Sequence, residues 1–145
     1  RRVLFRSLAL MGAEVLLFPT AIGSEPGCTT LDSSDHWQMT MRGHAAANIV
    51  PVVAANRIGR EAATTDPTLQ MNFYGSSFIC NHKGKLLAES DRDSAGVLVH
   101  SLDLATMREE RLTWGIYRDR RPEMYGALLS LDGRHANARW NTQGV

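Results

Sequence analysis

Two cysteines are the first candidates for chemistry in this chain of 145 residues. Cys28 lies in a loop-like GCTT segment with Glu25 and His36 nearby in the sequence, and a thiol beside a base can act as a nucleophile. The interpretation we favour is a loop cysteine without a catalytic role. Cys80 ends a run that should be a buried strand, where thiols are usually inert. Because two cysteines make no disulfide framework, the sequence indicates a reducing, cytosolic location.

Two histidines raise the question of a metal site. His36 and His44 fall on one predicted helix, about 80° apart around its axis. They could share a metal ion only in a distorted arrangement, so we prefer hydrogen-bonded structural roles for both. The sequence has neither the HExxH cluster nor the paired CxxC spacing of zinc sites. We therefore expect no metal and no cofactor.

The segment after the first predicted strand is the candidate binding site. Thr20, Ala21 and Ile22 directly follow the apolar run EVLLFP at 14–19. In α/β proteins, ligand contacts gather beyond the carboxyl ends of strands. We therefore expect these three residues to contact a ligand. The alternative is a connecting loop with no ligand role.

Helix and strand patterns alternate over the first part of the chain. Residues 8–13 are typical of the end of a helix that Gly12 terminates. The short apolar run at 14–19 favours a strand buried on both faces. A loop rich in Gly, Ser, Pro and Thr follows over 20–32.

A second helix and strand come next. Ser33 or Ser34 can cap the helix. Its buried side is predicted to be one stripe of residues spaced four, four and three apart, namely Trp37, Met41, Ala45 and Asn48. A strand at 49–56 follows without an intervening glycine. Pro51 cannot donate a ladder hydrogen bond, so it should lie at the start of the strand or at a bulge.

The remaining patterns complete a mixed sheet. After a polar loop at 57–70, a hairpin of strands at 72–80 and 85–90 is expected, joined by the turn NHKG. Another strand is predicted at 96–103, and a short charged helix at 104–111 capped by Asp103. Residues from 112 onward are loop-like and basic. The order predicts an α/β (α+β) fold with helices on one side of a mixed sheet.

Charge and hydropathy exclude two classes of partner. We expect residues 1–7 (RRVLFRS) to be a non-native, adapter-derived leader, and leaving out their three arginines changes the formal net charge from +1 to −2. The pI is then no argument for nucleic-acid binding. The segment RDRRPEMY alternates acid and base, which favours an ion-paired surface or an oligomer arm. No apolar run approaches the ~20 residues of a membrane helix, so we expect no membrane partner.

Four blocks of the sequence carry a resemblance to a known family. These are ALMGAEVLLFPTAIGSEP, SSDHWQMTMRGHAAANIVPVVAANRIG, FYGSSFI and WGIYRDRRPEMY. Together, and in this order, they resemble the carbon–nitrogen hydrolase (nitrilase) superfamily. The resemblance implies that residues 8–133 are the C-terminal part of that domain, half of an αββα sandwich. It also implies homo-oligomers built through a helix–sheet–helix interface. Residues 134–145 form a tail that diverges from the family.

The resemblance also implies a reaction. Family members use a Glu–Lys–Cys triad in which the thiolate attacks a carbamoyl or amide carbon. The matching residues would lie upstream of this chain, so no residue here is assigned a catalytic role. The fragment alone is expected to be inactive. The implied activity is an amidohydrolase cleaving N-carbamoylputrescine to putrescine, carbon dioxide and ammonia.

The same resemblance gives the loop after the first strand a role in binding. It places Thr20, Ala21 and Ile22 against the substrate channel, and Glu25 could hold the distal ammonium of a small carbamoyl amine. A solvated loop carboxylate is the alternative for Glu25. Two alternatives remain open for the chain: a non-catalytic structural or oligomerising half-domain, or a relative hydrolysing another carbamoyl or amide substrate.

Overall fold

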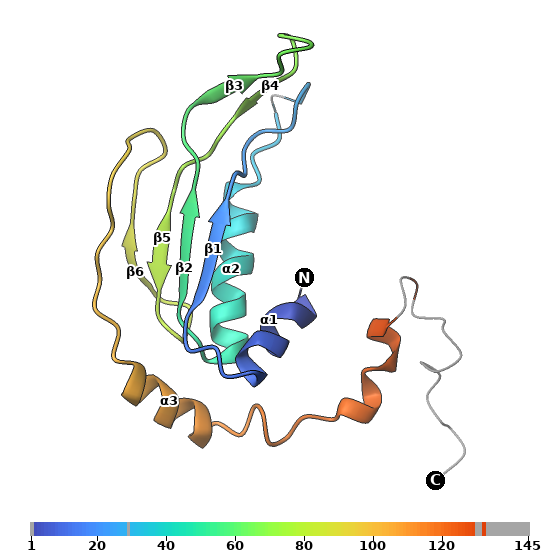
Figure 1. Cartoon of the computed structure of the whole chain (residues 1–145), viewed down its shortest axis with the longest axis vertical. Coiled ribbons are helices and arrows are strands. Elements are labelled where there is room, and N and C mark those ends of the chain that lie inside the picture. Colours follow the sequence, from blue (N-terminus) through green and yellow to red (C-terminus); the bar gives the residue numbers. More distant parts are fainter. Residues whose placement is uncertain (1, 29, 130–131, 133–145) are drawn as a thin grey trace.

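The computed structural model describes residues 2–28, 30–129 and 132 (Figure 1). Its elements in chain order are α1 Arg2–Leu10, β1 Leu16–Thr20, α2 Ser34–Asn48, β2 Val52–Asn56, β3 Arg60–Ala62, β4 Gln70–Asn72, β5 Phe78–Cys80, β6 Leu86–Glu89, α3 Leu104–Thr113, and the short 3₁₀ helices η1 Pro122–Met124 and η2 Gly126–Leu129.

A four-stranded sheet in the order β1-β2-β5-β6 organises the molecule. β1 and β2 are parallel, whereas β2–β5 and β5–β6 are antiparallel. Figure 1 shows α2 running along one face of the sheet, with α1 at its lower end. The predicted mixed sheet with helices on one side is therefore confirmed.

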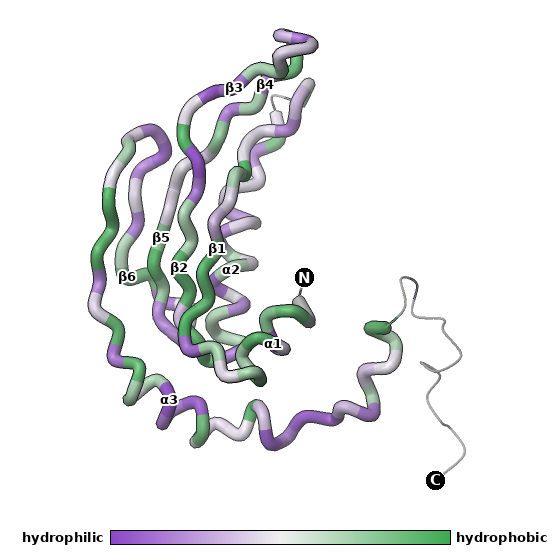
Figure 2. Tube along the Cα trace, viewed as in Figure 1, coloured by the Kyte–Doolittle hydropathy of each residue, from purple (hydrophilic) through white to green (hydrophobic). Residues whose placement is uncertain are grey.

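The core lies between this sheet and α2. Leu16, Val52 and Phe78 point into it from three neighbouring strands, and Trp37 and Ala45 meet them from the helix. The Trp37 and Phe78 rings pack edge to face, with centroids 5.6 Å apart. In Figure 2 β2 and the lower part of β1 are largely hydrophobic, whereas β3 and the stretch just before η1 are largely hydrophilic. Burial of one apolar face thus fixes α2 on the sheet.

The cap of α2 differs from the one expected. Ser33 is the N-cap residue, but its side chain makes no capping hydrogen bond. The Asp32 carboxylate accepts from the Ser34 backbone N–H at 2.9 Å instead. The predicted apolar stripe is confirmed, since Trp37, Ala45 and Asn48 are buried and Met41 packs against the core.

The junction between α2 and β2 corrects the strand boundary. Ile49 does not begin the strand but ends the helix in a left-handed conformation, φ 49°. Its N–H points back to the last turn, to the carbonyls of Ala45 and Ala46. A non-glycine residue in this region is strained. Pro51 lies just before β2, as predicted, and its carbonyl accepts from Leu16 N.

Three predictions about strands are wrong: one strand lacks a cover on one face, one predicted loop contains a paired strand, and one predicted strand has no partner. The prediction that the first strand is buried on both faces is wrong in the described chain, because Leu17 is 71% exposed. The polar loop at 57–70 contains β3, which pairs antiparallel with β4. Residues 96–103 form no strand, and Val97 and Val99 are 87% and 85% exposed.

Local signals were more reliable further along the chain. The β5–β6 hairpin is confirmed, although its strands are shorter than predicted. Its turn is held by Asn81 Oδ1, which accepts from the backbone N–H groups of Lys83 and Lys85 at 3.0 and 2.9 Å. Asp103 caps α3 as predicted, accepting from Thr106 N at 3.0 Å.

The structure describes nearly all of the N-terminal segment but not the C-terminal tail. Residues 2–7 lie within α1, where Phe5 is buried against the core, and the prediction that 1–7 are a non-native leader stays a prediction. The divergent tail at 134–145 lies outside the described residues. Among the residues that the structure describes, no helix combines the length and apolar character needed to cross a membrane.

Candidate functional site

A cavity of about 700 Å³ lies beside β1 and the loop that follows it. All four predicted binding residues, Thr20, Ala21, Ile22 and Glu25, are part of its lining. The four residues at and just after the end of β1 therefore share one cavity. That these residues bind a substrate stays a prediction.

The rest of the lining is mainly apolar. α1 contributes Leu4, Phe5 and Leu8, and α2 contributes Trp37 and Met41. The remaining lining residues are Leu17, Phe18, Pro19, Gly23 and Met71. Within the described part of the lining, Glu25 is thus the one ionisable side chain. An apolar wall with a single carboxylate is suited to an aliphatic cation.

Asn56 fixes the loop that lines this cavity. Its Oδ1 accepts from the Thr20 hydroxyl at 3.1 Å and from Ile22 N at 2.9 Å. Its Nδ2 donates to the carbonyls of Ile22 at 3.1 Å and Gly75 at 3.0 Å. Two donors and two acceptors are the full capacity of a side-chain amide. Asn56 therefore positions Thr20 and Ile22 and is not among the residues that line the cavity.

Arg57 follows Asn56 but faces other partners. Its guanidinium lies 4.9 Å from the centre of the Phe73 ring and forms an ion pair with Glu61. It lines a separate hollow between the sheet and residues 94–98. Of the two residues at the end of β2, the structure therefore brings neither into the cavity beside Glu25, and only Asn56 contacts its loop.

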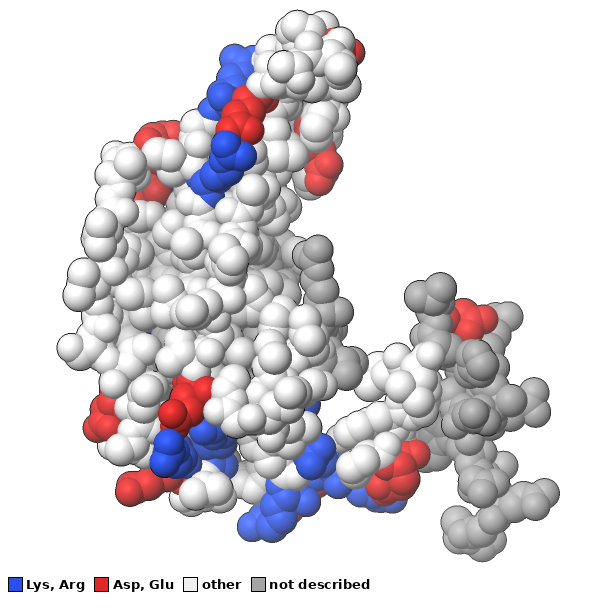
Figure 3. Space-filling model, viewed as in Figure 1, with Lys and Arg blue, Asp and Glu red and all other residues white. Residues whose placement is uncertain are grey.

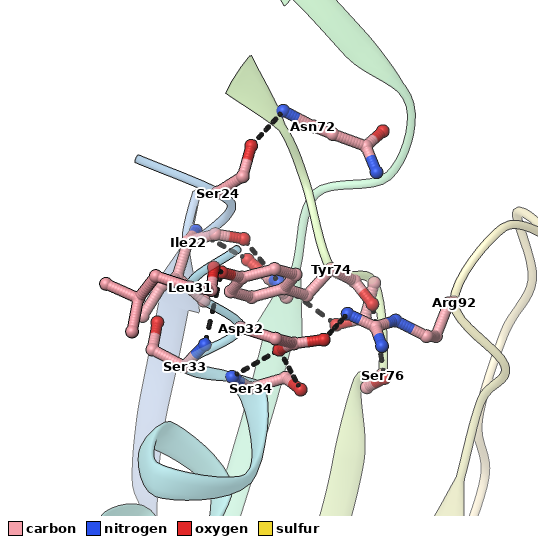
Figure 4. A network of polar contacts seen from close by, with 12 residues as sticks. Ile22, Ser24, Leu31, Asp32, Ser33, Ser34, Asn72, Tyr74, Ser76 and Arg92 are labelled. Atoms are coloured by element: carbon pink, nitrogen blue, oxygen red, sulfur yellow. Dashed lines mark hydrogen bonds and ion pairs between the residues drawn. The ribbon is translucent and has the colours of Figure 1, made fainter. Parts of the chain in front are cut away.

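The Glu25 loop begins with a paired anchor to β4. Ser24 N donates to the Asn72 carbonyl at 2.9 Å, and Ser24 Oγ accepts from Asn72 N at 3.0 Å (Figure 4). One residue later, the Glu25 carbonyl accepts from Cys28 N at 3.0 Å and turns the chain back. Glu25 itself is exposed at the cavity edge. The carboxylate is thus carried on a short turn next to a fixed point.

Neither cysteine has the surroundings of a catalytic nucleophile. Cys28 Sγ lies 3.6 Å from Thr30 Oγ1, and this hydrogen bond is the main cause that lowers the pKa of the thiol. His36 is exposed on α2, and no hydrogen bond joins it to Cys28 in the described part of the chain. Cys80 is buried, and burial raises the pKa of its thiol. The interpretation of Cys28 as a loop cysteine stays the one we favour.

The histidines do not form a metal site. His44 is buried and its ring centre lies 4.3 Å from that of Phe5, while His36 is exposed. The described residues contain no group of three or more His, Cys, Asp or Glu side chains arranged to hold a metal ion.

A polar cluster outside the cavity ties α3 to the β5–β6 turn. Glu110 Oε2 lies 2.5 Å from His82 Nε2 and 2.6 Å from Lys83 Nζ. The hydrogen bond from Lys83 comes first and that from His82 second among the causes that lower the pKa of Glu110. No sequence motif pointed to this contact, because Glu110 lies 27 and 28 residues along the chain from Lys83 and His82.

Comparison with known proteins identifies relatives of this fold and sequence. The family model described as "Carbon-nitrogen hydrolase" matches residues 2–111. N-carbamoylputrescine amidase of Arabidopsis thaliana is 52% identical over 130 residues, which cover 88% of this chain and 43% of that protein. Citrullinase of Francisella tularensis is 49% identical over 124 residues, covering 86% and 42%.

A solved structure agrees with these relatives. The crystal structure of a carbon-nitrogen hydrolase from Helicobacter pylori G27 matches with a TM-score of 0.81 and 33% identity, covering 90% of this chain and 46% of that one. The chain therefore spans less than half the length of the relatives it matches.

Proposed function

The chain belongs to the carbon-nitrogen hydrolase family, and we propose that it forms part of an amidohydrolase that cleaves N-carbamoylputrescine to putrescine, carbon dioxide and ammonia. One observation carries the choice of substrate. Glu25 is the one ionisable side chain in the described lining of an otherwise mainly apolar cavity. N-carbamoylputrescine has a matching shape, because an aliphatic chain separates its carbamoyl group from a terminal ammonium.

In this proposal the two ends of the substrate have different environments. The Glu25 carboxylate accepts charge-assisted hydrogen bonds from the ammonium. The methylenes pack against apolar side chains such as Trp37 and Met41. The carbamoyl carbon is attacked by a cysteine thiolate, and water completes the hydrolysis. The hydrogen bonds of the Cys28 thiol in the described chain come from Thr30 and Leu31, neither of which is a base, and Cys80 is buried. We therefore assign the reacting thiolate, glutamate and lysine to residues outside this chain.

Citrulline is the second candidate substrate, since a relative named citrullinase is 49% identical. Its distal end carries a carboxylate beside the ammonium. A carboxylate there needs a cationic partner, and the described lining of the cavity offers none. Repulsion between the citrulline carboxylate and Glu25 therefore favours the amine over the amino acid.

Binding to the purified chain tests the substrate directly, because it depends on this cavity wall and not on the reacting thiolate. Calorimetry compares N-carbamoylputrescine with N-butylurea, which has the same carbon chain but no ammonium, and with L-citrulline. We expect N-carbamoylputrescine to bind roughly fivefold more tightly than either, since Glu25 is exposed and its charge is screened.

Two variants separate Glu25 from other carboxylates. Glu25→Gln should abolish the preference for the ammonium, whereas Glu109→Gln, on the exposed side of α3, should retain it. Equal binding of N-carbamoylputrescine and N-butylurea to the unsubstituted chain, or tighter binding of L-citrulline, would refute the proposed substrate.

The uncharged sheet face supports association with further protein. In Figure 3 a broad face free of Lys, Arg, Asp and Glu lies between charged ends. Exposed apolar side chains such as Leu17 and Met11 favour burial in an assembly. We therefore include homo-oligomers in the proposal. We also include a cytosolic location, because two free thiols are typical of a reducing compartment.

A further inference from the structure

Resting on the function proposed above, we infer that Tyr74, Asp32 and Arg92 form a lock that positions Glu25 for the substrate ammonium. None of the three lines the cavity, so they act through the Glu25 loop and are positioning residues. They close the end of that loop opposite the Ser24–Asn72 anchor. With both ends fixed, the turn between them holds the carboxylate at the cavity edge.

Tyr74 supplies the first part of the lock. Its side chain is buried, and its hydroxyl lies 3.2 Å from Ser33 N, which donates to it. The same hydroxyl donates to the Leu31 carbonyl at 3.3 Å. Figure 4 shows the Tyr74 ring beside Leu31, with Asp32 next to it. One hydroxyl thus bridges the residues on both sides of Asp32 where the loop enters α2.

Asp32 and Arg92 supply the second part. Arg92 Nη2 lies 2.9 Å from Asp32 Oδ2, and the guanidinium lies 5.1 Å from the centre of the Tyr74 ring. Asp32 Oδ1 accepts from both the N–H and the hydroxyl of Ser34, at 2.9 and 2.6 Å. The hydrogen bond from the Ser34 hydroxyl is the main cause that lowers the pKa of Asp32 to about 2. The aspartate is therefore charged and held at any physiological pH.

The backbone under Arg92 is also fixed. A Cβ on Gly75, whose φ is +57°, would lie 2.3 Å from the Arg92 carbonyl oxygen. Ser76 N donates to the Asp91 carbonyl at 3.0 Å on the other side of the same contact. Residues 74–76 and 91–92 therefore form one rigid support, and the lock is attached to it at two side chains.

The test uses matched pairs of variants of the whole chain. Tyr74→Phe removes only the hydroxyl, and Tyr117→Phe removes a hydroxyl that donates to the Asn48 carbonyl elsewhere. Arg92→Gln removes the ion pair to Asp32, and Arg118→Gln removes the surface pair to Asp119. The readout is the ratio of affinities for N-carbamoylputrescine and N-butylurea, measured by calorimetry. A general loss of structure lowers both affinities together, but a displaced Glu25 lowers only the first.

We expect Tyr74→Phe and Arg92→Gln each to reduce this ratio roughly threefold, because each removes weak or exposed contacts, and Tyr117→Phe and Arg118→Gln to leave it unchanged. Arg92→Lys should restore part of the ratio by restoring the charge. Amide exchange at Ser33 should also become faster in Tyr74→Phe.

The outcomes separate two failures. If the unsubstituted chain shows no preference for the ammonium, the proposed substrate is wrong, and the lock cannot act by positioning Glu25 for it. If that preference is present but unchanged in Tyr74→Phe and Arg92→Gln, only the lock is overturned.

Discussion

Replacing Asn56 with alanine tests how the candidate binding wall is held. The substitution removes four hydrogen bonds, all between 2.9 and 3.1 Å, and leaves the Ile22 N–H and the carbonyls of Ile22 and Gly75 without this partner. A net contribution of about 1 kcal/mol per bond, reduced because the side chain is half-buried and water can replace part of it, gives a loss of about 2–3 kcal/mol. This is larger than most single substitutions produce.

Urea unfolding followed by far-ultraviolet circular dichroism measures this loss. With a slope of about 1.5–2 kcal/mol/M, the unfolding midpoint of Asn56→Ala should fall by about 1–2 M at unchanged slope. Asn72→Ala is the matched control, because the hydrogen bonds found for Asn72 in the described chain come from its backbone. Its midpoint should move by less than about 0.3 M. Equal midpoints for the two variants would refute the view that Asn56 holds this wall.

Two further predictions concern other contacts. Glu110→Gln should weaken the dependence of stability on acid. The depressed pKa of Glu110 contributes stability that is present above its unfolded value of about 4.3 and is lost as pH falls through the lower folded value. The thermal unfolding midpoints of the two proteins should therefore differ most at about pH 6 and converge as the pH falls through the folded value, and parallel curves would contradict this. Gly75→Ala should destabilise the chain by about 2–4 kcal/mol in urea unfolding, because its Cβ would meet the Arg92 carbonyl and its φ is positive. Gly43→Ala is the control, since a Cβ at this helical position meets no atom within 4 Å. A loss of stability in Gly75→Ala no larger than that in Gly43→Ala would count against the rigid support.

Local signals in the sequence predicted those parts of the fold that depend on a few neighbouring residues. Gly12, with φ +98°, ends α1 as expected, and Asp103 caps α3 through a bond three residues away. The Asn81 turn and Pro51 before β2 follow the same logic. In each case one residue type suits a local backbone need, such as a positive φ, a helix cap or a turn, and the neighbouring residues show where that need arises.

Burial could not be predicted with the same success. The run containing Leu17 is apolar enough for a strand covered on both faces, yet only one face is covered in the described chain. Val97 and Val99 alternate as in a strand but have no strand beside them. An alternating or apolar pattern shows that side chains suit a sheet. Whether the segment forms a strand, and whether both of its faces are buried, depends on a neighbouring strand and a covering layer.

The candidate site was predicted in part. Thr20, Ala21, Ile22 and Glu25 were named because they follow a strand end and match a family block, and all four line one cavity. The residues that support them could not be named. Asn56, 34 residues from Ile22, reaches it only through the parallel pairing of β1 with β2. Such long-range hydrogen bonds leave no pattern in a single sequence.

The parallel pairing of β1 with β2 also bears on the rate at which this chain can fold. Partner residues such as Leu16 and Val52 are 36 positions apart, and the 15 residues of α2 occupy much of the connection. By contrast, β5 and β6 are joined by a turn of a few residues and can pair almost at once. Non-local pairing requires the entropy of a long loop to be lost before its contacts form. We therefore expect the candidate binding wall at the end of β1 to form later than the β5–β6 hairpin.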